Sequence, residues 1–153
     1  MTESPNPSSE PSTILVADDN EQNLELLIAY LDELENVRIE TARDGAETME
    51  KIQSVHPDLV LLDIMMPKMS GFEICRKVKR DEKLRDIPIV MVTALNEMSD
   101  IERGVECGTD DFLSKPINRL ELVTRVKSLL RVKHLKSELE RTLAYLNDVE
   151  EDE

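Results

Sequence analysis

Short apolar runs and amphipathic segments alternate along most of the chain. The first run, TILVA at residues 13–17, predicts a buried strand, and the next segment, NLELLIAYLDEL at 23–34, carries leucine and isoleucine at helical spacing. Four further runs predict strands: VRIETA (37–42), DLVLLD (58–63), IPIVMVTA (87–94) and DFLS (111–114). Four further segments predict helices: 44–55, 71–81, 98–108 and 118–132. Five strands therefore alternate with five helices.

This alternation predicts an α/β domain with a parallel sheet. Strand–helix–strand units cross over with a right-handed turn and place helices on both faces of the sheet. The run DLVLLD is apolar without interruption, which is typical of a central strand buried on both faces. In a doubly wound sheet of this kind, ligands bind at the carboxyl ends of the strands.

The two ends of the chain differ from this regular part. Residues 1–12, MTESPNPSSEPS, are rich in Ser and Pro and are expected to form a disordered tail before a domain at 13–132. Residues 133–153 are expected to form a helical extension with an acidic end, too short for a DNA-binding or catalytic output domain. Its apolar residues follow a heptad pattern that Thr142 interrupts: Val132, Leu135, Leu139, Leu146 and Val149. A competing stripe includes Leu143, so a helical arm that forms a homodimer and a frayed tail remain alternatives.

Charge and composition exclude several classes of partner. The chain has 33 acidic and 19 basic residues, a formal charge of −14, which repels nucleic acid and anionic membranes. The first residues lack the basic and apolar segments of a signal peptide, and no apolar run reaches membrane-spanning length. We therefore expect a cytoplasmic protein that binds neither nucleic acid nor membranes.

Polar residues gather where the predicted strands end. They are Asp18, Asp19, Asp63, Thr93 and Lys115, and the backbone N–H of Ala94 adds a donor at the same edge. Three carboxylates at one edge of a sheet repel each other, which raises their pKa values unless a cation joins them. Mg²⁺ prefers oxygen ligands and keeps several waters, so it suits such an open acidic site. A lysine and a threonine hydroxyl beside it could bind a phosphoryl group.

The same residues indicate phosphoryl chemistry without a bound nucleotide. Neither GxxxxGK[ST] nor GxGxxG occurs, so the sequence lacks a glycine-rich loop for nucleotide phosphates. A phosphoryl group would therefore come from elsewhere and be transferred to a side chain. Asp63, at the end of the central strand, is the carboxylate best placed to act as the nucleophile.

Four motifs in order resemble one family. VADDN, LVLLDIMMPKMSG, VMVTA and DFLSKP are similar to the receiver domain of bacterial two-component response regulators over about residues 13–132. The resemblance implies a CheY-like, flavodoxin-like (βα)5 fold with strand order 2-1-3-4-5. It also implies that Asp63 accepts a phosphoryl group from a sensor histidine kinase or a histidine phosphotransfer protein.

Family positions carry over to the metal site. The resemblance implies that Asp19 binds Mg²⁺ directly, that Asp18 acts largely through water, and that Met65 contributes only its backbone carbonyl. Asp63 would complete the set of ligands.

Other positions carry over to phosphoryl binding and switching. Thr93, Lys115 and the backbone N–H of Ala94 would bind the phosphoryl group, and Pro116 would follow a cis peptide bond. Phe112 occupies the aromatic switch position, where it would turn inward when Thr93 moves toward the phosphate. A plain role for Phe112 as a core aromatic is the alternative.

One departure concerns the lifetime of the phosphorylated state. The two positions that influence hydrolysis in this family are Met65 and Leu95, both apolar and unable to orient water. We expect self-dephosphorylation to be slowed on the order of ten- to a hundredfold, the usual contribution of one proton-handling group.

The predicted function is a phosphorylation-dependent signalling switch, and the predicted catalysis is limited to its own phosphorylation and dephosphorylation. Phosphorylation would alter the surface of the fourth helix, fifth strand and fifth helix, which a downstream effector protein would read. One alternative is a docking module that works without phosphorylation, although docking alone needs no complete acidic site. The other is a haloacid-dehalogenase-like phosphatase, whose nucleophile would normally end the first strand in a DxD pair, unlike Asp63.

Overall fold

The sheet has the predicted topology. A computed structural model describes residues 10–94 and 98–151, so residues 1–9 of the tail expected at 1–12 lie outside the described residues. Ser12, which was expected in that tail, is buried and already belongs to the first strand. The strands are β1 (Ser12–Ala17), β2 (Val37–Ala42), β3 (Leu59–Asp63), β4 (Ile89–Thr93) and β5 (Asp111–Ser114). All pairings are parallel and the order is β2-β1-β3-β4-β5, which confirms the doubly wound arrangement.

The predicted helices are all present, with shifted ends. They are α1 (Glu21–Leu31), α2 (Gly45–Val55), α3 (Gly71–Arg80), α4 (Met98–Cys107) and α5 (Arg119–Glu151). Helix α1 begins two residues before the predicted segment and ends three residues before its predicted end. The chain turns there, and the N–H of Leu34 donates to the carbonyl of Leu31 at 2.9 Å. Leu34 still packs against the core, so its periodicity reports burial and not helix length.

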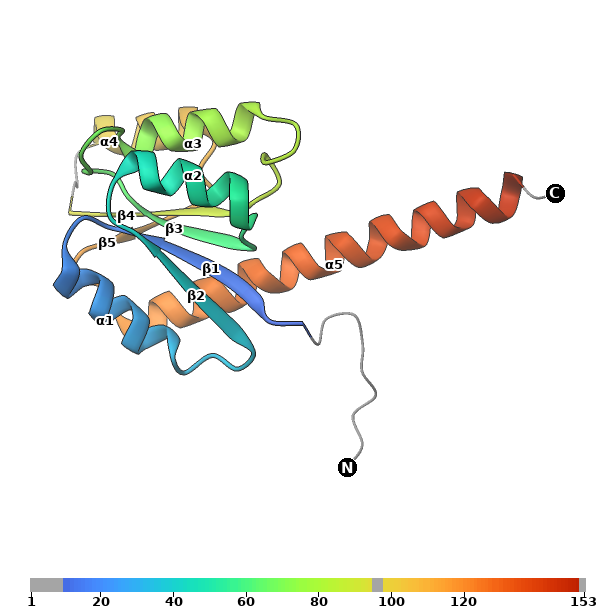
Figure 1. The fold of residues 1–153 in the computed structure, drawn as a ribbon, viewed down its shortest axis with the longest axis horizontal. Helices are drawn as coiled ribbons and strands as arrows, with labels where there is room; N and C mark the ends of the chain where they lie inside the picture. Colours follow the sequence, from blue (N-terminus) through green and yellow to red (C-terminus); the bar gives the residue numbers. More distant parts are fainter. Residues whose placement is uncertain (1–9, 95–97, 152–153) are drawn as a thin grey trace.

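Two apolar layers cover the two faces of the sheet. Neighbouring strand residues point to opposite faces, so Leu15 and Ile14 belong to different core clusters. Helices α2, α3 and α4 pack on one face and α1 and α5 on the other (Figure 1). Strand β3 is buried along its whole length, as the apolar run predicted. The core therefore lies on both sides of a rigid sheet whose carboxyl edge is left open.

Three helices begin with a side-chain cap directly after that edge. Asn20, Asp44 and Ser70 have extended backbones, and each accepts a hydrogen bond from the backbone N–H three residues on. Such caps satisfy N–H groups that have no partner within the helix and are worth about 1 kcal/mol each. They fix the short loops between the strands and α1, α2 and α3, which surround the acidic residues.

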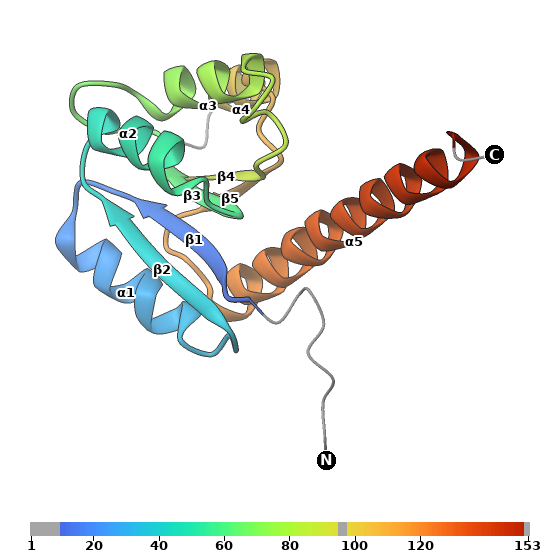
Figure 2. The ribbon, with the colours of Figure 1, turned by 45° about the vertical axis from the view of Figure 1, so that its right-hand side comes forward.

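Helix α5 includes the helical extension predicted beyond residue 132. Its first turns are capped by Asn118 and bury Leu122, Val126 and Leu130 against the sheet. The helix then continues without a break to Glu151 and projects away from the other elements (Figures 1 and 2). Within residues 10–94 and 98–151, no helix combines the length and apolarity needed to cross a bilayer.

Candidate functional site

The structure brings three of the predicted carboxylates together. Asp18 and Asp63 are buried with 1% and 5% of their surfaces exposed, whereas Asp19 is exposed. One oxygen from each of the three lies within 4.8 Å of the others. The first two follow from the pairing of β1 with β3, in which Ala17 lies opposite Leu62 and the residues after them become neighbours.

Backbone groups orient both buried carboxylates. Asp18 Oδ1 accepts from the backbone N–H of Asn20 at 2.9 Å, and Asp63 Oδ1 accepts from the N–H of Met65 at 3.2 Å. Each carboxylate thus uses one oxygen to close its own turn. The second oxygen of each points to a common partner.

That partner is Lys115. Its Nζ lies 3.4 Å from Asp18 Oδ2 and 3.4 Å from Asp63 Oδ2. The backbone N–H of Lys115 donates to the carbonyl of Thr93 at 2.8 Å, which holds the residue at the end of β5 beside β4. The peptide bond between Lys115 and Pro116 is cis.

One positive charge does not balance this cluster. Burial is the main cause that raises the pKa of Asp63 to about 6, and repulsion by Asp18 adds to it. Lys115 and the N–H of Met65 act in the opposite direction but do not compensate. The site therefore has a surplus of negative charge that a bound cation would relieve.

The remaining predicted residues lie around this centre. Thr93 is buried at the end of β4, and Ala94 is exposed directly after it. The Met65 side chain is 66% exposed, so it lies on the rim and does not close the site. Leu95, the second position predicted to affect hydrolysis, lies outside the described residues.

Phe112 packs against the core from β5 and meets a residue that sequence reasoning missed. Its ring end lies against Gly104 of α4, where even a methyl group would overlap ring atoms. Phe112 is half-buried and joins the core cluster on the α4 side. Gly104 therefore makes room for the aromatic ring, and its separation of eight residues from Phe112 gives no signal of this contact.

Gly71 is a second positioning residue that the sequence analysis did not identify. A Cβ at this position would lie 2.6 Å from the carbonyl oxygen of Asp63 and 2.8 Å from Cα of Ile64. Its own N–H donates to the carbonyl of Ile64 at 2.9 Å. The absence of a side chain thus lets the start of α3 approach the backbone of Asp63. The available sequence signal for this close approach was the motif MSG, which ends at the first residue of α3.

The donor set fits a hard divalent cation. The three clustered groups are carboxylates, the ligands that Mg²⁺ prefers, and the exposed Asp19 leaves one side open to water. No cysteine or histidine belongs to this cluster of described residues, so the site does not resemble a zinc centre.

Comparison with known sequences identifies one family. Residues 14–127 match the response regulator receiver domain. The chain is 46% identical over 126 residues to the response regulator PleD of Caulobacter vibrioides, covering 82% of this chain but 28% of PleD. It is 38% identical over 134 residues to the phosphate regulon transcriptional regulatory protein PhoB of Rhizobium meliloti, covering 88% of this chain and 58% of PhoB.

Solved structures agree with the sequence relatives. A response regulator from Chloroflexus aurantiacus is 32% identical with a TM-score of 0.75, and the match covers 80% of this chain and 99% of that one. A CheY-like receiver domain from Methanospirillum hungatei is 25% identical with a TM-score of 0.76, covering 83% and 99%. The chain thus corresponds to nearly all of these isolated domains and to only part of the longer regulators.

Proposed function

Because this chain belongs to the response regulator receiver family, we propose that it is a signalling switch that is phosphorylated on Asp63. The phosphoryl donor is a sensor histidine kinase or a histidine phosphotransfer protein, and the reaction depends on Mg²⁺. The observation that carries this proposal is the contact of Lys115 with both Asp18 and Asp63 inside a cluster of three carboxylates.

Each residue of the cluster has a defined part in the proposed transfer. A carboxylate oxygen of Asp63 attacks phosphorus, an O–P bond forms, the N–P bond of the donor breaks, and the imidazole leaves with the electron pair. Lys115, the Thr93 hydroxyl and the N–H of Ala94 bind the phosphoryl oxygens and neutralise their charge. Mg²⁺, held by Asp18, Asp19, Asp63 and the carbonyl of Met65, would add positive charge beside the same oxygens.

The phosphorylated state is proposed to be long-lived. Met65 is exposed and apolar, and Leu95 is apolar, so neither side chain can orient a water molecule toward the acyl phosphate. We expect hydrolysis to be slower on the order of ten- to a hundredfold than with a polar group at these positions. A half-life of phospho-Asp63 well under a minute would contradict this part of the proposal.

The signal is proposed to pass from the rim to the surface of α4, β5 and α5. Thr93 would move toward the phosphoryl group, and Phe112 would turn further inward over Gly104. A downstream effector protein would then read the changed surface. Fluorescence of a reporter on α4 should change on phosphorylation of the native chain and stay constant for Asp63→Asn.

The organisation of the chain is part of the proposal. Residues 13–132 form the receiver domain, and residues 133–153 form an extension of α5 through which the chain forms a homodimer. The expected disorder of residues 1–9, a cytoplasmic location and the absence of nucleic acid binding remain predictions from the sequence.

Intact-mass spectrometry after incubation with acetyl phosphate tests the central claim. The native chain should gain one phosphoryl group with Mg²⁺ and none with excess chelator. Asp63→Asn should gain none in either condition, and Asp58→Asn, at the opposite edge of the sheet, should behave like the native chain.

Two outcomes favour the alternatives. If a candidate effector bound the native, phosphorylated and Asp63→Ala forms equally, the chain would be a docking module that works without phosphorylation. Steady turnover of a small phosphate ester would favour a haloacid-dehalogenase-like phosphatase. The position of Asp63 at the end of β3, and not of β1, argues against that second reading.

A further inference from the structure

The projecting part of α5 carries a stripe of exposed large hydrophobic side chains. They are Val132, Leu135, Leu139, Leu143 and Leu146, each between 49% and 61% exposed. Thr142 lies in the same stripe, and its hydroxyl already donates to the carbonyl of Glu138 at 3.0 Å. The hydroxyl therefore needs no other partner, and the residue can lie against an apolar surface.

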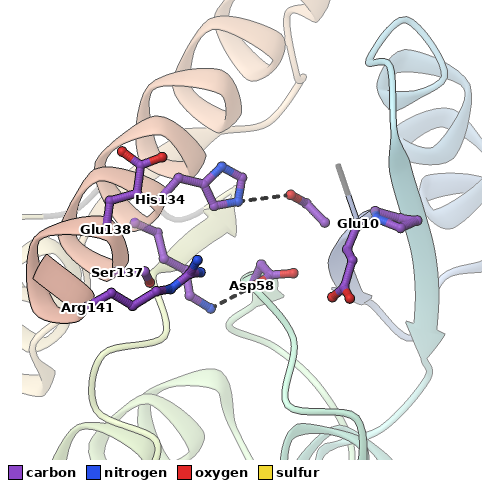
Figure 3. A pocket seen from close by; sticks show the side chains of 9 residues that line it. Glu10, Asp58, His134, Ser137, Glu138 and Arg141 are labelled. Atoms are coloured by element: carbon purple, nitrogen blue, oxygen red, sulfur yellow. Dashed lines mark hydrogen bonds and ion pairs between the residues drawn. The ribbon is translucent and has the colours of Figure 1, made fainter. Parts of the chain in front are cut away.

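A different side of α5 contacts the receiver domain. Lys133 Nζ lies 3.1 Å from Asp58 Oδ1, and His134 Nε2 lies 3.2 Å from Ser12 Oγ. Figure 3 shows this side of the helix facing β1 and Asp58 across a small pocket that Ser137 and Arg141 also line. The base of the extension is thus fastened to the amino edge of the sheet.

The stripe points away from that side. Successive residues of a helix are rotated by about 100°, so Leu139 and Leu146 lie roughly half a turn around the axis from Ser137 and Arg141. The spacing of Leu135, Leu139, Thr142 and Leu146 alternates between four and three residues, as in a coiled-coil seam. A second helix can therefore pack along this face without displacing the contacts of Lys133 and His134 with the domain.

Charge is distributed unevenly along the extension. Residues 131–136 contain three basic and no acidic residues, if His134 is neutral, which gives +3. Residues 148–151, the last described turn of the helix, contain three acidic and no basic residues, which gives −3. Lys133 and Lys136 already contact Asp58 and Asp86, so the basic segment is partly neutralised in the monomer.

This asymmetry decides between the two orientations of a helix pair. In a parallel pair the two acidic segments would lie side by side, with six carboxylates on two helices whose axes are about 10 Å apart. In an antiparallel pair with Leu135 opposite the partner's Leu146, Leu139 lies opposite the partner's Thr142. Residue 150 of each chain then lies 19 residues, or about 28 Å, from its counterpart. That distance far exceeds the Debye length of roughly 8 Å at physiological ionic strength.

We infer that α5 is a self-association surface whose partner is a second copy of α5 in the antiparallel orientation. The acidic segment of each copy lies beside residues 131–133 of the other, where Arg131 is exposed. Removal of like-charge repulsion contributes more than new ion pairs, because two of the three basic residues already have partners. The inference rests on the proposed homodimer and is independent of phosphorylation.

Disulfide formation between variants that each carry one added cysteine tests the orientation. Leu135→Cys and Leu146→Cys are prepared separately, one of them labelled with ¹⁵N, then mixed, oxidised and analysed by mass. We expect mainly the mixed disulfide, because cysteines at the same position would lie about 16 Å apart along the axis, whereas a disulfide requires Cα atoms within about 7 Å. The native chain is the control for Cys75 and Cys107, which are both buried.

The state of association gives a second measurement. Sedimentation equilibrium of the native chain should show a dimer in equilibrium with the monomer. Disulfides between like positions would overturn the antiparallel orientation and leave the proposed homodimer intact. A monomer at every concentration, without either disulfide, would overturn both. Phosphorylation of the same samples by acetyl phosphate reports separately on the proposed switch.

Discussion

The two edges of the sheet place carboxylates in different electrostatic surroundings. At the amino edge, Asp58 accepts from the N–H of Thr13 at 2.7 Å and from Lys133 at 3.1 Å. Asp110 likewise accepts from the N–H of Ile89 at 2.7 Å and from Lys79 at 2.9 Å. Each carboxylate of this pair thus has its own backbone donor and its own lysine.

At the carboxyl edge, two buried carboxylates share one lysine, and the exposed Asp19 lies beside them. Lys115 lies 3.4 Å from both Asp18 and Asp63, which is longer than either lysine contact at the amino edge. Charged groups that are fully paired contribute to stability, whereas crowded carboxylates reduce it unless a ligand binds. The ion pairs at the amino edge therefore stabilise the fold. The crowded carboxylates at the carboxyl edge lower its stability and favour binding of a cation.

The largest difference between the two edges is expected between Lys115 and Lys133. Lys115→Ala should reduce the rate of phosphorylation by acetyl phosphate on the order of 10²–10³-fold, the usual effect of removing one group that stabilises a developing charge. Lys133→Ala should leave this rate unchanged and lower the free energy of unfolding by about 1 kcal/mol. Timed intact-mass spectra and urea denaturation measure the two quantities. Equal losses of rate in both variants would contradict the division between the edges.

Binding of Mg²⁺ at the carboxyl edge should raise the thermal stability of the native chain. A ligand at a hundred times its dissociation constant stabilises the folded state by about 2.7 kcal/mol. For a domain of this size, that corresponds to a rise in Tm of about 5–10 °C. We expect this rise for the native chain and for Asp58→Asn, and little of it for Asp19→Asn. A similar rise in Asp19→Asn would show that the cation binds elsewhere.

Much of this site could be predicted because parallel strands bring their carboxyl ends to one edge. Asp18 and Lys115 are 97 residues apart, yet the alternation of strands and helices is enough to place them together. Contacts that depend on how loops fold back could not be predicted. The pair of Lys133 with Asp58, the approach of Gly71 to Asp63 and the contact of Gly104 with Phe112 leave no periodic pattern.

The ends of helices were also poorly determined by pattern. Leu34 keeps helical spacing although α1 has already ended, because a turn returns its side chain to the core. The continuation of α5 had two readings, since apolar residues beyond residue 132 fit a helical arm as well as a frayed tail. The structure has a helix there, and the disulfide experiment tests whether a second copy of α5 packs against it.

The raised pKa of Asp63 predicts a specific dependence of stability on pH. Its pKa is about 6 in the folded, metal-free chain, above the ordinary value of 3.8. A carboxyl whose folded pKa is raised favours the folded state below the unfolded pKa, and this contribution is lost as pH rises from about 4 to above 6.

Asp63→Asn should remove this dependence. Without metal at pH 8 we expect the variant to be more stable than the native chain by on the order of 1–3 kcal/mol, and the difference should vanish below about pH 4. Urea denaturation in chelator across this range measures it, with Asp58→Asn as the control. A difference that does not change with pH would show that packing, and not ionisation, separates the two proteins.

The smallest contrast concerns two glycines at opposite edges. Gly108, just before β5 at the amino edge, has a φ of +88°, so Gly108→Ala should cost about 1 kcal/mol of stability through backbone strain. Gly71→Ala should cost a similar amount, because its Cβ would press on the backbone of Asp63 and Ile64, which cannot rotate away. Only Gly71→Ala should also slow phosphorylation, by about tenfold, since small displacements of a nucleophile are costly. If Gly108→Ala slowed phosphorylation equally, general loosening of the sheet would explain both effects, and the carboxyl edge would have no special sensitivity.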